Sequence, residues 1–312
     1  MLTYEKLIRK PRAFRSMTGL NIDEFERVYG DFEYCYGETE AERLARPDRQ
    51  RARGAGGQFK HNLRTRLMMT LIWLRTYPTY EVLGVLFDLD KGNISRNLKS
   101  ILAALEKVTG YDIEWPDKTR RKLQMTEAMQ SFSQVFAIGD GMEQPVQRPK
   151  DNKKQKEYYS GKKKRHTVQN QVVVAPNGEI IALSEDEPGS CHDLTHLRVS
   201  DILDKLEPGD TVMFDLGYLG LQNDRDDVVF ILPFRKPKGG ERTLSQKEFN
   251  RLVARCRVVV ENTICHLKRF QVLYQVYRHV LAERPRTVRI IAGLVNRQIR
   301  RRPLRRLALS VC

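Results

Sequence analysis

The sequence predicts an α/β domain that is preceded by an all-α region. Two observations lead to this fold class. Residues 61–107 carry apolar side chains at helical spacing. From residue 135 onward, short apolar runs typical of buried strands alternate with helical segments. Because one pair of runs resembles a hairpin and others are joined through helices, we expect a mixed central sheet.

The all-α region has the pattern of a helix-turn-helix. An amphipathic helix begins after residue 61 and ends at Pro78, a second helix covers 80–87, and a third covers 93–107 after a polar turn. The third helix is expected to turn polar side chains outward, namely Ser95, Arg96, Asn97, Lys99 and Ser100. In a helix-turn-helix, the second helix of the motif, which is here the helix 93–107, enters the major groove of DNA with its polar face. We therefore expect Arg96, Asn97 and Lys99 to contact DNA.

The α/β region begins after Trp115-Pro116 with a helical stretch over 117–131. A first strand, 135–138, is expected to stop at Gly139-Asp140-Gly141. The other predicted strands are 167–174, 179–183, 211–214 and 228–232, the first two joined by the turn Pro176-Asn177-Gly178. The predicted helices are 192–206 and 245–270.

Composition and charge point to a polyanionic partner. The 312 residues include 55 Lys and Arg against 39 Asp and Glu, a net charge of +16. Basic runs lie at 148–165 and, with nine arginines, at 284–306. Runs of this kind contact phosphates without reading sequence. Five scattered cysteines and the lack of a signal sequence or long apolar run predict an intracellular protein, cytoplasmic or nucleoid-bound, with no membrane association.

Two aspartates occupy the same kind of position. Asp140 and Asp215 each follow an apolar strand and precede a glycine-containing turn. Acids beyond buried strands lie at the sheet edge where open α/β sheets bind ligands, and carboxylate oxygens suit Mg²⁺ and Mn²⁺. A third acid from the long helix, Glu248 or Glu261, would complete a two-metal phosphoryl-transfer site. Glu261 shares its helix face with Arg257 and Lys268, two cations that suit phosphate contact. The simpler interpretation is that Arg257 and Glu261 form only an i,i+4 ion pair.

Several motifs in order resemble one family. They are Asp140-Gly141-x-Glu143-x-Pro145-x-Gln147-Arg148-Pro149, Tyr158-Tyr159-Ser160-Gly161 followed by Lys162 to Thr167, Gly189-Ser190-x-His192-Asp193, Asp215-x-Gly217-Tyr218, and Arg257-x3-Glu261-x6-Lys268. The chain resembles a D-D-E transposase of the insertion-sequence-five group and is similar to Harbinger-type endonucleases. Two positions depart from the family pattern, because Met142 stands where threonine is usual and Ala254 where a related signature has tyrosine.

The resemblance implies a ribonuclease-H-like catalytic domain over 117–283, after a helical region over 1–116 and before an arginine-rich tail over 284–312. It implies Asp140, Asp215 and Glu261 as catalytic residues and ligands of two Mg²⁺ or Mn²⁺ ions. The activity implied is cleavage at the terminal inverted repeats of a transposon and strand transfer into target DNA. DNA contacts are expected from Arg148, Lys162, Lys163, Lys164, Arg165, Arg257 and Lys268. Because such an enzyme acts on the two ends of a transposon, we expect a homodimer on DNA. The resemblance also implies an accessory role near the site for the His192-Asp193 pair.

Two other interpretations stay open. His192 and His196 have the i,i+4 spacing of a zinc hydrolase motif, beside Cys191, but Asp193 stands where such sites have glutamate. The second alternative is a domesticated or inactive transposase-derived protein that binds DNA without cutting it.

Overall fold

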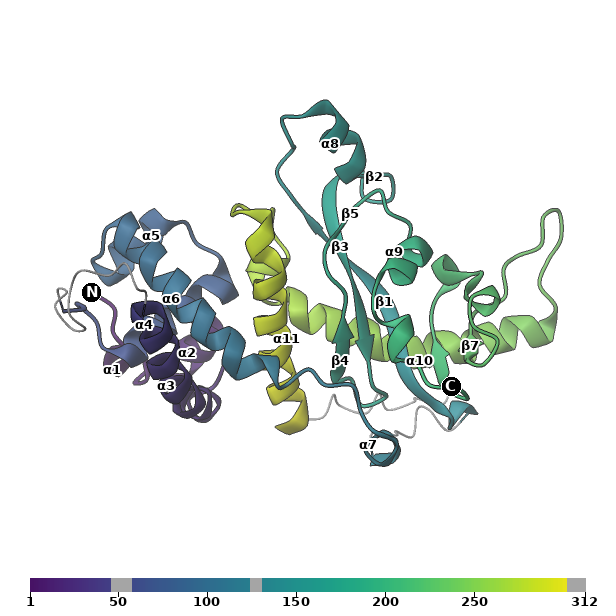
Figure 1. Cartoon of the computed structure of the whole chain (residues 1–312), viewed down its shortest axis with the longest axis horizontal. Coiled ribbons are helices and arrows are strands. Elements are labelled where there is room, and N and C mark those ends of the chain that lie inside the picture. Colours follow the sequence, from purple (N-terminus) through teal and green to yellow (C-terminus); the bar gives the residue numbers. More distant parts are fainter. Residues whose placement is uncertain (46–57, 124–130, 302–312) are drawn as a thin grey trace. The chain divides into compact units, whose positions relative to one another are not determined.

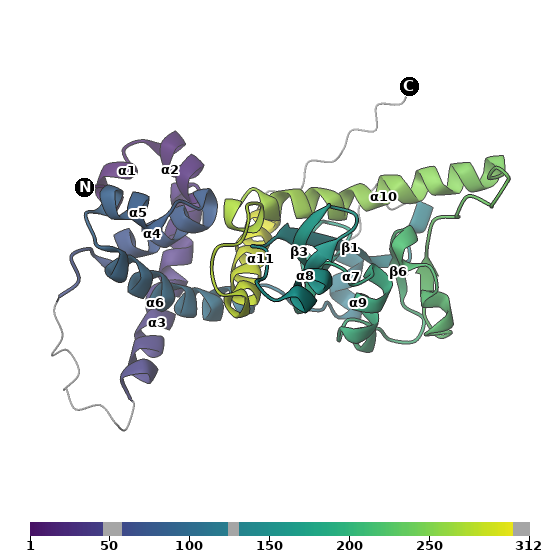
Figure 2. The same ribbon diagram turned by 90° about the horizontal axis from the view of Figure 1, so that it is seen from above.

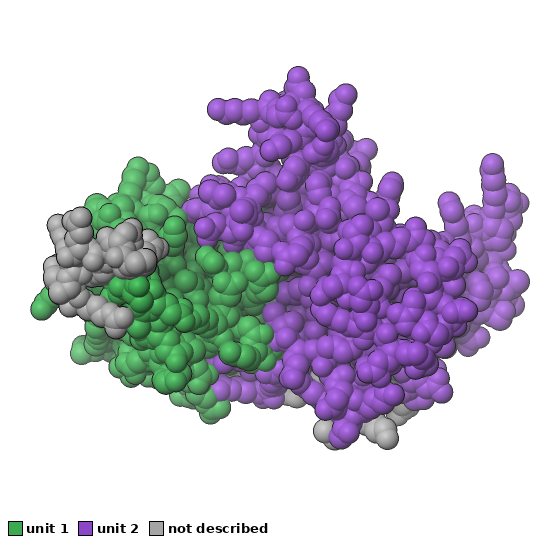
Figure 3. Space-filling model, in the orientation of Figure 1, with its two compact units in different colours: residues 1–112, 268–275, 286–294 green, residues 113–267, 276–285, 295–312 purple. Residues whose placement is uncertain are grey.

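The computed structural model describes residues 1–45, 58–123 and 131–301 (Figure 1). The chain divides into two compact units (Figure 3), which are described separately. The first contains Met1–Asp112, Lys268–Gln275 and Arg286–Leu294, and the second contains Ile113–Leu267, Val276–Pro285 and Val295–Cys312. None of the described helices combines the length and apolar character that crossing a lipid bilayer requires.

The first unit is helical. Its helices are α1 (Tyr4–Leu7), α2 (Pro11–Thr18), α3 (Ile22–Leu44), α4 (Leu63–Thr76), α5 (Tyr80–Phe87) and α6 (Lys91–Gly110). The helix expected to be amphipathic, α4, is instead buried on all sides from Thr65 to Leu74. The reason is tertiary, because α1, α2, α3, α5 and α6 all pack against it.

The helix-turn-helix elements form where the sequence predicts them. Side chains of Asn62, Thr79 and Asp90 cap α4, α5 and α6 by accepting bonds from backbone N–H groups. Asp88 takes a left-handed conformation (φ 53°) in the turn between α5 and α6. Three consecutive capped helices therefore give this segment defined boundaries.

One expectation for the third helix is wrong. Asn97 does not face outward but is buried, with 6% of its surface exposed. Its Oδ1 accepts a bond of 2.8 Å from Nε of the buried Arg66 on α4. The partner lies 31 residues away, so no pattern within the helix reveals it. Arg96 and Lys99 are exposed as predicted.

The second unit is built on a seven-stranded mixed sheet. Its strands are β1 (Val135–Pro145), β2 (Tyr159–Ser160), β3 (Arg165–Val174), β4 (Ile180–Leu183), β5 (Glu187–Pro188), β6 (Thr211–Met213) and β7 (Val229–Ile231). The order is β2-β3-β1-β6-β7, with β4 and β5 also pairing with β3. β1 runs antiparallel to β3 and parallel to β6, and β6 runs parallel to β7. The sheet is mixed, as predicted.

The first strand is longer than expected. β1 does not stop at Gly139 but continues to Pro145, and Asp140 pairs with Val172 of β3. Pairing with β3 keeps this glycine-containing segment extended. Gly139 is required for packing, because a Cβ there would lie 2.1 Å from the ring of Phe214. Asp140 is therefore an interior strand residue rather than a residue of a turn.

The helices of this unit include α7 (Lys118–Leu123), α8 (Asn152–Tyr158), α9 (Asp193–Val199) and α10 (Leu244–Lys268). Figure 2 shows α10 along one side of the sheet and α9 on the other. The helix expected over 192–206 ends at Val199, because Ser200 turns the chain: its Oγ donates to Leu197 O and accepts from Ile202 N. A short 3-10 turn, Leu203–Lys205, follows.

The segment expected as an arginine-rich tail begins as a helix, α11 (Arg284–Arg301). Arg284 is fully buried, with 0% of its surface exposed. Its Nε donates to Gln144 Oε1 at 2.7 Å and its Nη1 to Asn170 Oδ1 at 2.6 Å, and it forms an ion pair with Asp186. A residue of the basic run that was expected to contact phosphates thus holds β1, β3 and the segment before β5 together. Residues 302–312 lie outside the described residues.

We expect Arg284→Met to destabilise the second unit by about 3–5 kcal/mol, because it removes the cation paired with Asp186 and the donor to two buried amide oxygens. At roughly 2–4 °C per kcal/mol, the unfolding midpoint measured by circular dichroism falls by about 6 °C or more. The matched control, Arg301→Met, changes an exposed arginine of the same helix. Equal midpoints for the two variants would contradict the structural role of Arg284.

Candidate active site

Arg257 lies among the three acids that the sequence singles out. Its Nη2 is 3.0 Å from Asp140 Oδ2 and 3.9 Å from Asp215 Oδ2, and its Nη1 is 3.7 Å from Glu261 Oε1. Asp140 belongs to β1, Asp215 follows β6, and Arg257 and Glu261 belong to α10. The structure therefore brings Asp140, Asp215 and Glu261 to one guanidinium group. Glu248, the other candidate, is exposed on α10.

Local backbone bonds orient the two aspartates. Asp140 Oδ1 accepts a bond from Gly141 N at 2.8 Å. Asp215 Oδ1 accepts one from Gly217 N at 2.7 Å, at the start of the 3-10 turn Leu216–Tyr218. Because β1 and β6 are parallel neighbours, the two residues reach the same part of the sheet. The Glu261 side chain is 53% exposed, so the site is open to solvent on the α10 side.

The site concentrates negative charge. Burial raises the pKa of Asp140 above its ordinary value; Arg257 and the Gly141 N–H oppose this shift, and Asp215 and Asp193 add to it. Burial is also the main cause that raises the pKa of Asp193, with Lys162 opposing it. Tyr218 is buried with its hydroxyl on Gln171, and burial beside these carboxylates raises its pKa well above 10. The phenol therefore stays protonated in this surrounding.

Asp193 is the acid whose position the sequence did not predict. Its carboxylate lies against Gly141 and Gly217: a Cβ on Gly141 would be 2.9 Å from Asp193 Oδ1, and a Cβ on Gly217 would be 3.0 Å from Oδ2. Only the Gly189-Ser190-x-His192-Asp193 motif pointed to it, with an accessory role. Spacing along the chain could not show that α9 begins beside Gly141 of β1 and Gly217 after β6.

Carboxylate oxygens are the donors that Mg²⁺ and Mn²⁺ prefer, so the chemistry of the acids gathered here fits a divalent cation. Within the described part of the chain, no three His, Cys, Asp or Glu side chains are arranged to hold a metal ion directly. The guanidinium of Arg257 stands among the three acids instead.

Comparison with known proteins identifies the family. Residues 139–296, about half of the chain, match the family of DDE superfamily endonucleases, and residues 62–110 match the helix-turn-helix of DDE superfamily endonucleases. The chain belongs to the DDE superfamily endonucleases. Members of this superfamily generally use divalent metal ions. The chain is also 28% identical over 289 residues to a probable transposase for insertion sequence element IS702 from Microchaete diplosiphon, covering 92% of this chain and 95% of that protein. No solved structure matches.

The basic residues expected to contact DNA in this endonuclease fall into two groups. Exposed ones are Arg148, Lys162, Lys163, Lys164 and Arg165. Arg148 bonds to Gln155 on α8, and Lys162 to Lys164 form the turn before β3. Arg257, in contrast, is engaged with the carboxylates, and Lys268 is the half-buried last residue of α10, in the first unit. The two departures from the family pattern are a fully buried Met142 and an exposed Ala254.

The zinc interpretation of the endonuclease's histidines does not fit. His192 is exposed, whereas His196 is buried and its Nε2 lies 2.8 Å from Ser184 Oγ. Burial lowers the pKa of His196. The two rings therefore lie in different surroundings, and among the described residues they form no metal site with Cys191.

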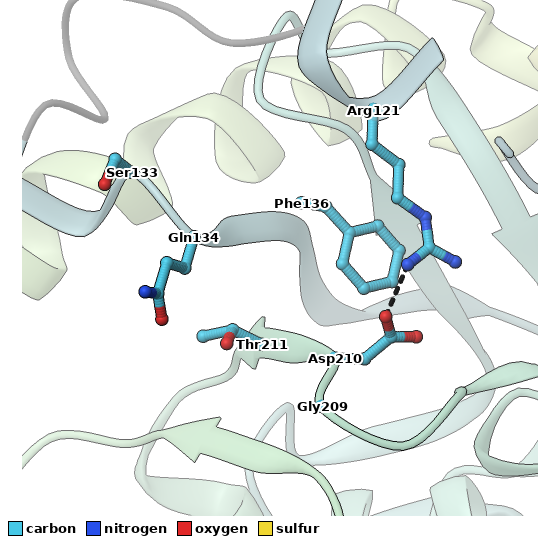
Figure 4. Close-up of a pocket in the computed structure, with 7 residues that line it drawn as sticks. All are labelled: Arg121, Ser133, Gln134, Phe136, Gly209, Asp210 and Thr211. Atoms are coloured by element: carbon cyan, nitrogen blue, oxygen red, sulfur yellow. Dashed lines mark hydrogen bonds and ion pairs between the residues drawn. The ribbon is translucent and has the colours of Figure 1, made fainter. Parts of the chain in front are cut away.

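A pocket of about 160 Å³ lies elsewhere in the endonuclease unit (Figure 4). Its lining includes Gln134 and Thr211, at the start of the parallel strands β1 and β6. There Arg121 forms an ion pair with Asp210 and lies over the Phe136 ring, 3.8 Å from its centroid. The pocket is thus at the other end of the strands from Asp215, and its charged groups neutralise each other.

The lowered pKa of His196 predicts how the stability of the endonuclease depends on pH. The unfolded histidine binds a proton near pH 6.5 and the folded one only at lower pH, so stability falls as pH drops below about 6.5, by at most about 1.4 kcal/mol per pH unit. We expect His196→Gln to flatten this loss between pH 7 and 5, measured by urea unfolding. An exposed-histidine control, His192→Gln, keeps the wild-type slope; an unchanged slope in His196→Gln would contradict the assignment.

Proposed function

We propose that this chain is the transposase of an insertion sequence, which cleaves DNA at the element's ends and joins those ends to target DNA. The observation that carries the proposal is the meeting of Asp140, Asp215 and Glu261 around Arg257, from three separate elements. These residues fall within the part that matches DDE superfamily endonucleases. The similarity to a probable insertion-sequence transposase over most of both chains supports the same activity.

In this proposal Asp140, Asp215 and Glu261 would hold two Mg²⁺ or Mn²⁺ ions. Ions held there would supply Lewis-acid chemistry, lowering the pKa of an attacking water or DNA 3′-OH and stabilising the leaving oxygen. Arg257, which pairs with all three acids, balances the carboxylate charge. The parallel neighbours β1 and β6, with antiparallel β3 beyond β1 and α10 on one face, support a ribonuclease-H-like fold.

The helix-turn-helix indicates DNA binding, and we propose that it selects the terminal inverted repeats. The exposed basic turn, Lys162 to Arg165, and Arg148 follow the DNA backbone near the cleavage site. Acting on two ends suits a homodimer on DNA. A protein that only binds DNA is not favoured, because all three acids are present and meet at one place.

We expect Asp215→Asn to reduce metal-dependent cutting more than about 100-fold, since changes at residues that only support a metal ligand already cost 10–100-fold. The substrate is a supercoiled plasmid carrying the encoding locus with its flanks, and cuts are mapped at their 3′-OH ends. Asp201→Asn, which changes an exposed aspartate paired with Lys205, is the matched control. Persistent cutting by Asp215→Asn would show that the metal assignment is wrong, and binding without cutting by the wild type would support the DNA-binding alternative.

Two exposed residues of α6 are expected to differ in their effect on DNA binding. Arg96 Nη2 bonds to Asn93 Oδ1 at 2.9 Å, and the Asn93 amide bonds to Asp90, so the exposed guanidinium of Arg96 is held in one orientation, which suits base contact. We expect Arg96→Ala to weaken binding to the preferred sequence by about 1–3 kcal/mol and to relax specificity. Lys99→Ala should instead weaken binding to all sequences alike. Gel-shift titration against a random duplex tests both, and equal loss for every duplex with Arg96→Ala would contradict base readout.

A further inference from the structure

We propose that Asp193 is a fourth acidic residue of the active site, which acts through its negative charge on divalent-cation binding beside Asp140 and Asp215. This inference rests on the proposed function, because it concerns the same site. It adds a residue from α9, an element that the three-acid arrangement does not use.

Two glycines of the site, Gly141 and Gly217, leave space in the backbone for the Asp193 carboxylate. Gly141 follows Asp140, and Gly217 lies two residues after Asp215; a Cβ on either would press on the Asp193 oxygens at 2.9 and 3.0 Å. The Gly217 position is also 3.0 Å from Asp215 Oδ1, so an oxygen of Asp193 and an oxygen of Asp215 lie no more than 6.0 Å apart. Asp193 therefore stands between the segments that carry the first two acids.

Other acids near the site have partners, and Asp193 differs from them. Glu143 accepts a bond from Thr167 Oγ1 at 2.9 Å, and Asp186 pairs with the buried Arg284. Among the described residues, no donor bonds to either carboxylate oxygen of Asp193, and no ion pair reaches it; only its backbone oxygen receives a bond, from Gln171. In its charged form, a half-buried carboxylate beside two others and without a donor is costly unless a cation compensates it.

Among the described residues, the two cations that act on these acids do not meet this need. Arg257 pairs with Asp140, Asp215 and Glu261. Lys162 is the cation that favours the charged form of Asp193, and its side chain is exposed to water. A divalent ion near Asp140 and Asp215 would supply the missing positive charge at the oxygens of Asp193.

The test measures Mn²⁺ binding to the full-length protein without DNA, by electron paramagnetic resonance of free Mn²⁺. Asp193→Asn preserves the shape between the two glycines and removes the charge. We expect it to weaken Mn²⁺ binding about tenfold, and to raise by a similar factor the Mn²⁺ concentration for half-maximal plasmid nicking. Its unfolding midpoint in EDTA stays equal or rises, because repulsion from Asp140 and Asp215 is removed, whereas a purely structural role would lower it.

Two further variants make each outcome decisive. Asp201→Asn is expected to bind Mn²⁺ like the wild type, and Asp215→Asn to lose binding. Wild-type affinity in Asp193→Asn beside a loss in Asp215→Asn would overturn this inference and leave the proposed function standing. Wild-type affinity in both would overturn the proposed metal site itself. If Asp193→Asn fails to fold, Asp193→Ala, which empties the space between the glycines, answers the same question by the same measurements.

Discussion

The arrangement of the catalytic unit depends on one electrostatic constraint, the gathering of several carboxylates at one place on the sheet. Asp140 and Asp215 come from parallel neighbouring strands, so the topology itself places like charges together. Arg257 compensates these negative charges only if α10 packs on the sheet where its guanidinium reaches both aspartates. The Thr263 hydroxyl, bonded to Gly178 O at 3.0 Å, and the buried Val260 hold α10 in that position. The ion pairs of Arg257 thus join α10 to β1 and to the segment after β6, and they also offset the negative charge of the site.

The same constraint explains the glycines on both strand segments. Oxygens of several acids can approach one another only where the backbone adds no side chains. Gly141 and Gly217 leave that space, and each also donates its backbone N–H to the aspartate it accompanies. Each glycine therefore leaves space for the carboxylates and also orients the aspartate to which it donates. A larger residue at either position would displace the Asp193 carboxylate from its place between the strands.

Local patterns predicted much of this protein, and most of the departures share one cause. The helices α5 and α6 and the strand pair β3 and β4 follow from periodicity and turn residues. The strand-end positions singled out Asp140 and Asp215, whereas only the resemblance to D-D-E transposases chose Glu261 over Glu248. The continuation of β1 past Asp140, the burial of Asn97 and Arg284, and the position of Asp193 depend on partners far along the chain. Asn97 is hydrogen-bonded to Arg66, whereas Arg284 is hydrogen-bonded to Gln144 and forms an ion pair with Asp186. Polar residues whose partners are distant look like surface residues in the sequence.

Net charge therefore overstates the surface available to a polyanion. Arg257 and Arg284 contribute to the charge of +16, yet one is engaged with the site's carboxylates and the other is fully buried. Lys162 to Arg165 are different, since all four are exposed and none forms an ion pair with a described residue. Phosphate attraction at the catalytic unit should then depend on this short turn more than on total charge. Because Lys162 also acts on Asp193, the turn links backbone contact to the electrostatics of the acids.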